Sequence, residues 1–183
     1  MYGLINKAIR DMVCDRFGEE IWQIIKQKAE IKIDTFLRME PYPDDLTHKL
    51  VRVTSEVVGL SGAEIMQAFG EYWIQYTGKA GYGAMMDMGG DTLPEFLENL
   101  DELHTRLSIN FPEYHPPSFE CTETQENSLE LHYRSSRHGL TAMVVGLLKG
   151  LGTRFNTEVN VVQTQNREEG AEHDAFLIEY KPN

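Results

Sequence analysis

The spacing of apolar residues changes about two-thirds of the way along this chain of 183 residues. As far as residue 110, apolar side chains recur every three or four positions, which is the period of an amphipathic helix. Pro112, Pro116 and Pro117 then exclude a continuing helix, and shorter segments with alternating apolar side chains follow. Helices followed by strands indicate an α+β fold, in which a small antiparallel sheet carries one embedded helix.

Local signals divide the chain into segments. Ser61 with Glu64, and Thr92 with Pro94 and Glu95, are typical of helix N-termini. The predicted helices cover approximately residues 4–13, 18–29, 48–58, 61–76, 92–110 and 140–155, with a turn at 39–46 and a loosened glycine-rich stretch at 78–90 that holds a short methionine-rich piece. The predicted strands cover residues 118–122, 128–134, 158–163 and 175–180.

The composition is that of a globular protein with one core, because hydrophobic residues form 41% of the chain and charged residues 25%. We therefore expect residues 1–183 to form a single domain. Seventeen Lys and Arg residues against 29 Asp and Glu residues give a net charge of −12. This charge repels phosphate backbones and anionic lipid surfaces, so neither nucleic acid nor a membrane is an expected partner.

The cysteines and the amino-terminal residues indicate the cellular compartment. Cys14 and Cys121 are the only cysteines, which excludes a disulfide framework and a CxxC metal pair. Lys7, Arg10 and Asp11 lie where an exported protein needs an apolar segment, so no signal peptide is visible. We expect the protein to be cytoplasmic.

One histidine lies on an apolar helix face. In the predicted helix 92–110, His104 falls on the stripe formed by Phe96, Leu97, Leu100, Leu103 and Leu107. A core histidine whose ring is satisfied by a carbonyl or a water is one interpretation. The other is a metal ligand, because a neutral imidazole among apolar side chains is what an axial ligand to an apolar cofactor requires.

A second pattern places three hydrogen-bond donors close together. Tyr133, Ser135 and Arg137 are two positions apart, and an extended segment would point their side chains the same way. A phenol, a hydroxyl and a guanidinium on one side suit a ligand that carries carboxylates or phosphates. A polar strand edge is the alternative interpretation of the same spacing.

A glycine-rich helix follows these donors. Gly146, Gly150 and Gly152 surround Lys149, but the order of a phosphate-binding loop, with Lys after Gly, is missing. Small residues that allow close helix packing explain this pattern better.

Taken together, these features resemble the H-NOX domain, the haem nitric oxide/oxygen-binding fold of bacterial sensors and of the soluble guanylate cyclase haem domain. His104 is followed by Pro116-Pro117 and then by Tyr133-x-Ser135-x-Arg137, in the order and spacing of that family. Three segments resemble the cyclase β-subunit version especially: Met1-Tyr2-Gly3-Leu4-Ile5-Asn6, Phe96-Leu97-Glu98-Asn99-Leu100-Asp101-x-Leu103-His104, and Pro117-Ser118-Phe119-x-Cys121.

The resemblance implies roles for these residues. His104 would be the proximal ligand of a five-coordinate b-type haem between the helical part and the sheet, and Tyr133, Ser135 and Arg137 would bind its propionates. Pro117 would press on the porphyrin, and Ile5 would pack on the distal side.

The resemblance also implies gas selectivity. Oxygen-binding members carry a distal Tyr where this chain has Met143, so the pocket would bind NO and CO and discriminate against O₂. Trp73 falls where oxygen binders carry a second distal polar residue, and its indole N–H could donate to a ligand or simply pack.

The expected function is therefore a gas sensor without catalysis of its own. NO binding would break the bond to His104 and shift the helices, and the output would act on a separate protein such as a histidine kinase or a cyclase. The alternative is a binding module or carrier for another carboxylate-bearing tetrapyrrole or a lipid, which would use Arg137 but not need His104. A peroxidase-type haem enzyme would need a distal acid/base pair, which Met143 and Trp73 do not provide.

Overall fold

The structure is a computed structural model that describes residues 1–110 and 115–182. Four helices form the first part of the chain: α1 (Gly3–Phe17), α2 (Glu19–Lys28), α3 (Asp44–Val58) and α4 (Gly62–Thr77). A π-helical turn, η1 (Gly78–Tyr82), leads from α4 to the short helices α5 (Gly83–Asp87), α6 (Leu93–Glu98) and α7 (Leu100–Asn110). The capping box predicted at Ser61 and the N-cap predicted at Thr92 are both present, at the starts of α4 and α6, and Thr92 forms a capping box with Glu95 as well.

The second part is a four-stranded antiparallel sheet with one helix inserted. Its strands are β1 (Ser118–Gln125), β2 (Ser128–Arg134), β3 (Thr157–Gln165) and β4 (Asp174–Pro182), in the spatial order β1-β2-β4-β3. Helix α8 (Thr141–Arg154) connects β2 to β3, and the short 3₁₀ turn η2 (Arg167–Glu169) precedes β4. The predicted α+β class and the embedded helix are confirmed.

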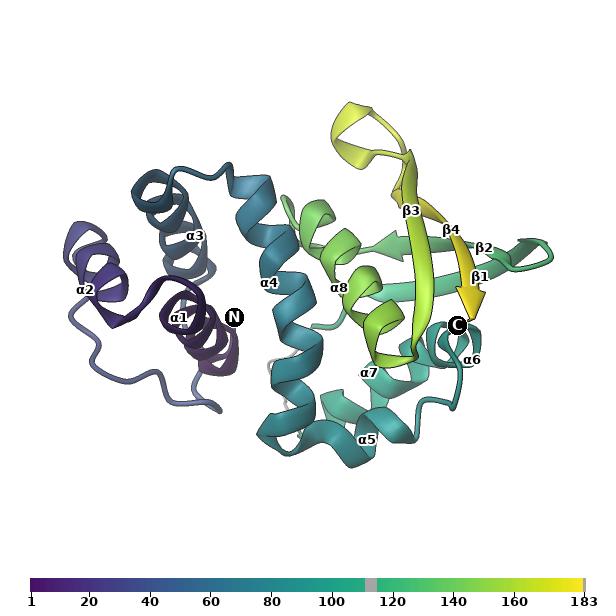
Figure 1. The fold of residues 1–183 in the computed structure, drawn as a ribbon, viewed down its shortest axis with the longest axis horizontal. Helices are drawn as coiled ribbons and strands as arrows, with labels where there is room; N and C mark the ends of the chain where they lie inside the picture. Colours follow the sequence, from purple (N-terminus) through teal and green to yellow (C-terminus); the bar gives the residue numbers. More distant parts are fainter. Residues whose placement is uncertain (111–114, 183) are drawn as a thin grey trace.

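Two helices join the two parts. Figure 1 shows α1, α2 and α3 at one end, the sheet at the other, and α4 beside α8 between them. The close approach of α4 and α8 depends on glycine: a Cβ on Gly146 would lie 2.0 Å from the Gln67 carbonyl oxygen, and one on Gly70 would lie 2.3 Å from that of Met143. The packing role predicted for Gly146 is therefore confirmed.

The buried apolar residues form two clusters, one on each side of this helix pair. The cluster in the first part is built from α1 to α4 and includes Ile9, Trp22 and Phe69. The other cluster lies between α8, α6 and the sheet, and it includes Phe96 and Leu131. Trp73 of α4 packs against both clusters, so it marks the boundary between them.

Three predictions about segment limits are corrected. The helix predicted over 92–110 is broken at Asn99, whose backbone leaves the helical region (φ −89°, ψ 0°) and whose amide donates to the Gly89 carbonyl at 3.0 Å. Helix α3 begins at Asp44, inside the predicted turn. Most of the stretch after residue 77 forms helical turns rather than a loosened chain, in η1 and α5, although the backbones of Gly81 and Gly90 are not helical.

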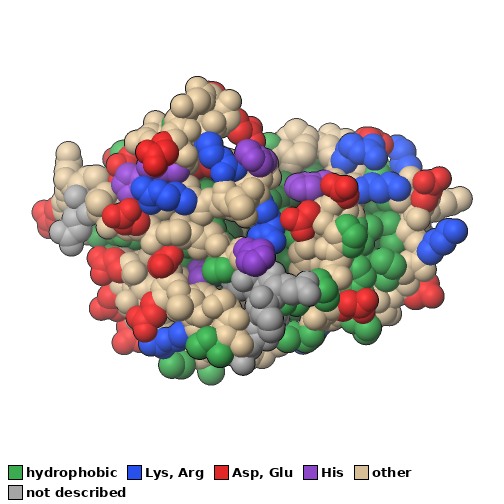
Figure 2. Space-filling view, turned by 180° about the vertical axis from the view of Figure 1, so that it is seen from behind, with side chains coloured by type: hydrophobic (Ala, Val, Ile, Leu, Met, Phe, Trp, Pro, Cys, Tyr) green, Lys and Arg blue, Asp and Glu red, His purple; other side chains and the backbone are tan. Residues whose placement is uncertain are grey.

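Asp and Glu side chains are spread over both ends of the face that Figure 2 shows. Two further points complete the fold. Phe111 and Pro112, where the sequence predicts the change of pattern, lie outside the described residues. None of the helices in the described ranges has the length and apolar character needed to cross a bilayer.

Candidate functional site

A largely apolar cavity of about 680 Å³ lies between the amino-terminal helices and the part that contains the sheet. Its volume is within the range of roughly 300–1,000 Å³ that is usual for sites of drug-sized ligands and cofactors. All eight residues that the sequence singles out for the site line this one cavity: Ile5, Trp73, His104, Pro117, Tyr133, Ser135, Arg137 and Met143.

His104 projects from α7 into this cavity. Its Nδ1 lies 2.8 Å from the carbonyl oxygen of Leu100, one turn earlier in the helix. Because a carbonyl can only accept, this contact assigns the ring proton to Nδ1 and the lone pair to Nε2. A backbone carbonyl that holds Nδ1–H in this way is the usual partner of a metal-binding histidine.

The surroundings of His104 keep its ring neutral and fixed. The imidazole stacks on the Phe119 ring, with 5.2 Å between centroids and 26° between planes. Burial lowers the pKa of His104 below its ordinary value, against the opposing effects of the Leu100 carbonyl and Asp101. The neutral imidazole is the form that can bind a metal ion.

Among the described residues, His104 is not part of a cluster of metal-binding side chains. Within residues 1–110 and 115–182, no group of three or more His, Cys, Asp or Glu side chains is placed to hold a metal ion. A macrocycle such as haem supplies most of the ligands of its own metal, so a single imidazole suits it.

The three predicted donors meet at one side of the cavity, although only one lies on a strand. Tyr133 belongs to β2 and is 5% exposed, whereas Ser135 and Arg137 lie in the bend that follows the end of this strand at Arg134. The Arg137 amide donates to the Ser135 hydroxyl at 3.1 Å. Burial raises the pKa of Tyr133 above its ordinary value, against a hydrogen bond with Ser135. The bend, not strand alternation, brings the three side chains together.

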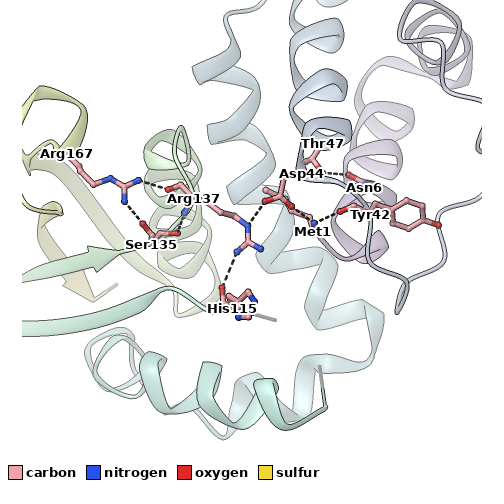
Figure 3. A network of polar contacts seen from close by, with 9 residues as sticks. All are labelled: Met1, Asn6, Tyr42, Asp44, Thr47, His115, Ser135, Arg137 and Arg167. Carbon is pink, nitrogen blue, oxygen red and sulfur yellow. Dashed lines mark hydrogen bonds and ion pairs between the residues drawn. The ribbon is translucent and has the colours of Figure 1, made fainter. Parts of the chain in front are cut away.

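The Arg137 guanidinium connects the two parts of the molecule (Figure 3). Its Nε donates to Asp44 Oδ2 at 3.0 Å, and its Nη1 donates to the His115 carbonyl at 3.1 Å. Asp44 also accepts from the Met1 amino group, which donates in addition to the Tyr42 carbonyl at 2.6 Å. Partial burial raises the pKa of Asp44, but the hydrogen bonds from Met1 and Arg137 outweigh it and hold this pKa below its ordinary value.

A second arginine supports the bend from the other side. Arg167, in η2, donates to the carbonyl oxygens of Ser135 and of Arg137, the latter at 2.7 Å. Sequence reasoning missed Arg167, Asp44 and His115, because they approach Arg137 only through the fold.

The opposite wall of the cavity is apolar. Ile5 from α1, Trp73 from α4 and Met143 from α8 line it, and each also packs against the amino-terminal cluster. The thioether of Met143 is a weak acceptor without a proton to donate. The indole of Trp73 lies against Phe69, with 5.9 Å between ring centroids.

The fold and this cavity define a ligand-binding domain that combines apolar walls with one imidazole and a group of polar donors at one side. The chain belongs to the family described as Haem-NO-binding, whose sequence profile matches residues 2–163.

The most informative curated relatives are cyclases. Soluble guanylate cyclase gcy-31 of Caenorhabditis elegans is 34% identical over 87% of this chain and 23% of its own length. Soluble guanylate cyclase gcy-35 of the same organism is 32% identical over 98% of this chain and 26% of its own length. The chain therefore spans about a quarter of the length of these relatives.

Solved structures confirm the H-NOX fold. An H-NOX protein from S. oneidensis in the Fe(II)NO ligation state is 20% identical, with a TM-score of 0.89 over 99% of each chain. An Fe(II) unliganded H-NOX protein from K. algicida is 22% identical, with a TM-score of 0.86 over 100% of this chain and 98% of its own.

Proposed function

We propose that this chain is a haem-based sensor that binds NO and CO and discriminates against O₂, with His104 as the only protein ligand of a five-coordinate ferrous b-type haem. The orientation of His104 carries the proposal. Its Nδ1–H is held by the Leu100 carbonyl at 2.8 Å, and the ring faces an apolar cavity. When bound, the haem would supply an iron with one open position for a gas.

The chemistry of the lining fits such a ligand. The apolar walls suit a macrocycle, and Tyr133, Ser135 and Arg137 suit two carboxylates, because guanidinium binds carboxylate strongly and hydroxyls complete its hydrogen bonding. Pro117 and Ile5, on the cavity wall, would pack on the macrocycle.

Gas selectivity would follow from the apolar wall. Bound O₂ carries considerable negative charge and gains from a distal donor, whereas NO and CO polarise less. Met143 offers no proton, and in this proposal the Trp73 indole serves to pack.

The signal would leave through α7. This helix contacts α6 and β1, so a displacement of His104 after loss of its axial bond would move α7 relative to the sheet. We propose that this displacement acts on a separate signalling protein, such as a histidine kinase or a cyclase, in the cytoplasm. The chain would perform no catalysis of its own.

A carrier of another carboxylate-bearing tetrapyrrole or of a lipid is the second candidate. The same apolar cavity and Arg137 would serve it. It would not require an oriented imidazole, so the two candidates differ in the need for His104.

The test is an absorption spectrum of the purified full chain after addition of hemin, reduced and then exposed to air, CO and NO. The proposal expects the protein to bind one hemin per chain and to give a five-coordinate ferrous spectrum after reduction. Air should produce no spectrum of an O₂ complex before the iron is oxidised, whereas CO and NO should each produce new absorption bands. A protein that stays colourless, or binds hemin without responding to either gas, contradicts it.

A further inference from the structure

Three aromatic side chains of α4 form a continuous stack that begins at the cavity. Trp73 lines the cavity, and its ring lies 6.2 Å from that of Tyr76, with 25° between planes. Tyr76 in turn stacks on Tyr72 at 5.7 Å and 29°. Both separations are within the range of direct aromatic contact, so the three π-systems are adjacent without an intervening group.

The far end of the stack meets a proton acceptor at the surface. The Tyr72 hydroxyl donates to Asp15 Oδ2 at 2.8 Å, and Asp15 is exposed near the end of α1. Burial, followed by this hydrogen bond, raises the pKa of Tyr72 above its ordinary value, so the phenol keeps its proton at neutral pH. The geometry thus joins the cavity wall to a surface carboxylate.

This order of groups matches what one-electron transfer requires. Indole and phenol are among the side chains from which an oxidant in water most readily removes a single electron. A phenol loses its proton when it is oxidised, and a carboxylate already bonded to the hydroxyl can take that proton without rearrangement.

We propose that Trp73, Tyr76 and Tyr72 form a one-electron path that carries an oxidising equivalent from the cavity to Tyr72, whose proton passes to Asp15 at the surface. The proposal rests on the proposed function in one respect: a cavity that admits NO also admits nitrogen dioxide, the one-electron oxidant formed when NO meets O₂. The path protects the interior of the site from that radical.

The reaction balances in three steps. Nitrogen dioxide takes one electron from the Trp73 indole and leaves as nitrite. One electron then passes from Tyr72 through the intact Tyr76 ring to the Trp73 radical cation, while the Tyr72 proton moves to the Asp15 carboxylate. A small thiol or ascorbate in solution returns one hydrogen atom to the Tyr72 phenoxyl radical, and the Asp15 proton passes to water.

The transfer can be tested without NO or haem. Azide radicals from pulse radiolysis remove single electrons preferentially from tryptophan, and the absorbance of tryptophanyl and tyrosyl radicals can be followed separately. The second tryptophan, Trp22, is 4% exposed in the amino-terminal cluster, so the background is the full chain carrying Trp22→Phe. In this background the tryptophanyl radical at Trp73 should convert to a tyrosyl radical. The rate should be independent of protein concentration, because the electron transfer takes place within one chain.

Two substitutions identify the tyrosine that the tryptophanyl radical oxidises. Tyr72→Phe should abolish most of the tyrosyl radical and prolong the life of the tryptophanyl radical by about an order of magnitude or more. Tyr82→Phe removes a hydroxyl from another tyrosine of the cavity lining and should change neither. Loss of the tyrosyl signal with Tyr82→Phe but not with Tyr72→Phe would overturn the path, as would an unchanged signal in both variants.

The role of the carboxylate has its own test. Asp15→Asn leaves a hydrogen-bond acceptor beside Tyr72 but a much weaker base, so the conversion should slow by about an order of magnitude. A conversion that keeps its rate contradicts proton transfer to Asp15. Circular dichroism of each variant establishes that it is folded, and separate hemin titration keeps a failure of the path distinct from a failure of the haem proposal.

Discussion

Arg137 Nε donates to Asp44 Oδ2 at 3.0 Å, although the two residues are 93 positions apart in the chain. The ion pair joins the bend after β2 to the first turn of α3, and both residues line the cavity. Arg137 is therefore held in place by the amino-terminal part of the molecule, while it faces the space where we propose that carboxylates bind.

The Asp44 pair should stabilise the fold in a pH-dependent way. Asp44→Asn should lower the free energy of unfolding at neutral pH by up to about 1 kcal/mol, because the side chain is 40% exposed and water screens the pair. The folded-state pKa of Asp44 is lowered, so this stabilisation is complete above the unfolded pKa of about 3.9 and is lost as the pH falls through the folded value. Urea unfolding at several pH values measures it.

Asp45→Asn is the matched control for this pair. It removes the same charge from the first turn of α3, where acidic residues favour the helix, but Asp45 is exposed and no hydrogen bond or ion pair with Arg137 is recorded for it in the described structure. Equal losses in the two variants would show that the helix terminus, rather than the contacts of Asp44 with Arg137 and Met1, accounts for the effect.

The crossing of α4 and α8 should be intolerant of a side chain at Gly146. Gly146→Ala would place a Cβ 2.0 Å from the Gln67 carbonyl oxygen, so we expect a loss of about 1–3 kcal/mol in the free energy of unfolding. Gly62→Ala, at the start of α4, meets no atom within 4 Å and should change stability by less than about 1 kcal/mol. Denaturant titration compares the two, and similar losses would contradict the packing account.

Met143→Tyr should place a hydrogen-bond donor at a position of the cavity wall that has none. A phenol on this wall can donate to bound O₂, so the ferrous protein should acquire measurable O₂ affinity while CO affinity changes little. Spectral titration with O₂ under reducing conditions checks this, and Met143→Phe is the control that adds a ring without a donor. No gain with Met143→Tyr would mean that other features of the wall determine selectivity.

Arg137 should contribute to cofactor affinity through its charge and its shape. Arg137→Ala should weaken hemin binding by roughly tenfold or more, since a hydrogen bond to a charged group contributes about 1.5–3 kcal/mol. Arg137→Lys keeps the charge but loses the forked geometry, and its affinity should be intermediate. Hemin titration followed by absorbance measures both, and an unchanged affinity in Arg137→Ala would remove Arg137 from the proposed carboxylate site.

The parts of the fold that were predictable depend on local signals. The Ser61–Glu64 capping box and the Thr92 N-cap act within three residues, and both are present as predicted. The break in the helix at Asn99 was missed because the apolar stripe continues across it, and the hydrogen bond from Asn99 to Gly89, ten residues away, leaves no periodic pattern.

The same distinction applies to the site. The apolar stripe around His104 and the spacing of the donors Tyr133, Ser135 and Arg137 indicated part of the site. The resemblance supplied the other predicted residues, Ile5, Trp73, Pro117 and Met143, and all eight line one cavity. The residues that hold Arg137 could not be found in this way, because Asp44 and His115 reach it only after the two parts of the chain have packed. A partner that the tertiary fold alone brings close leaves no signal in a single sequence.

The most direct test of the central claim replaces the proposed axial ligand. Ferrous spectra of the full chain and of His104→Gly should be recorded with hemin, with and without added imidazole. The account predicts that His104→Gly loses the five-coordinate histidine spectrum and that free imidazole restores it by occupying the space of the missing ring. A His104→Gly protein that binds hemin with the unaltered spectrum would contradict it.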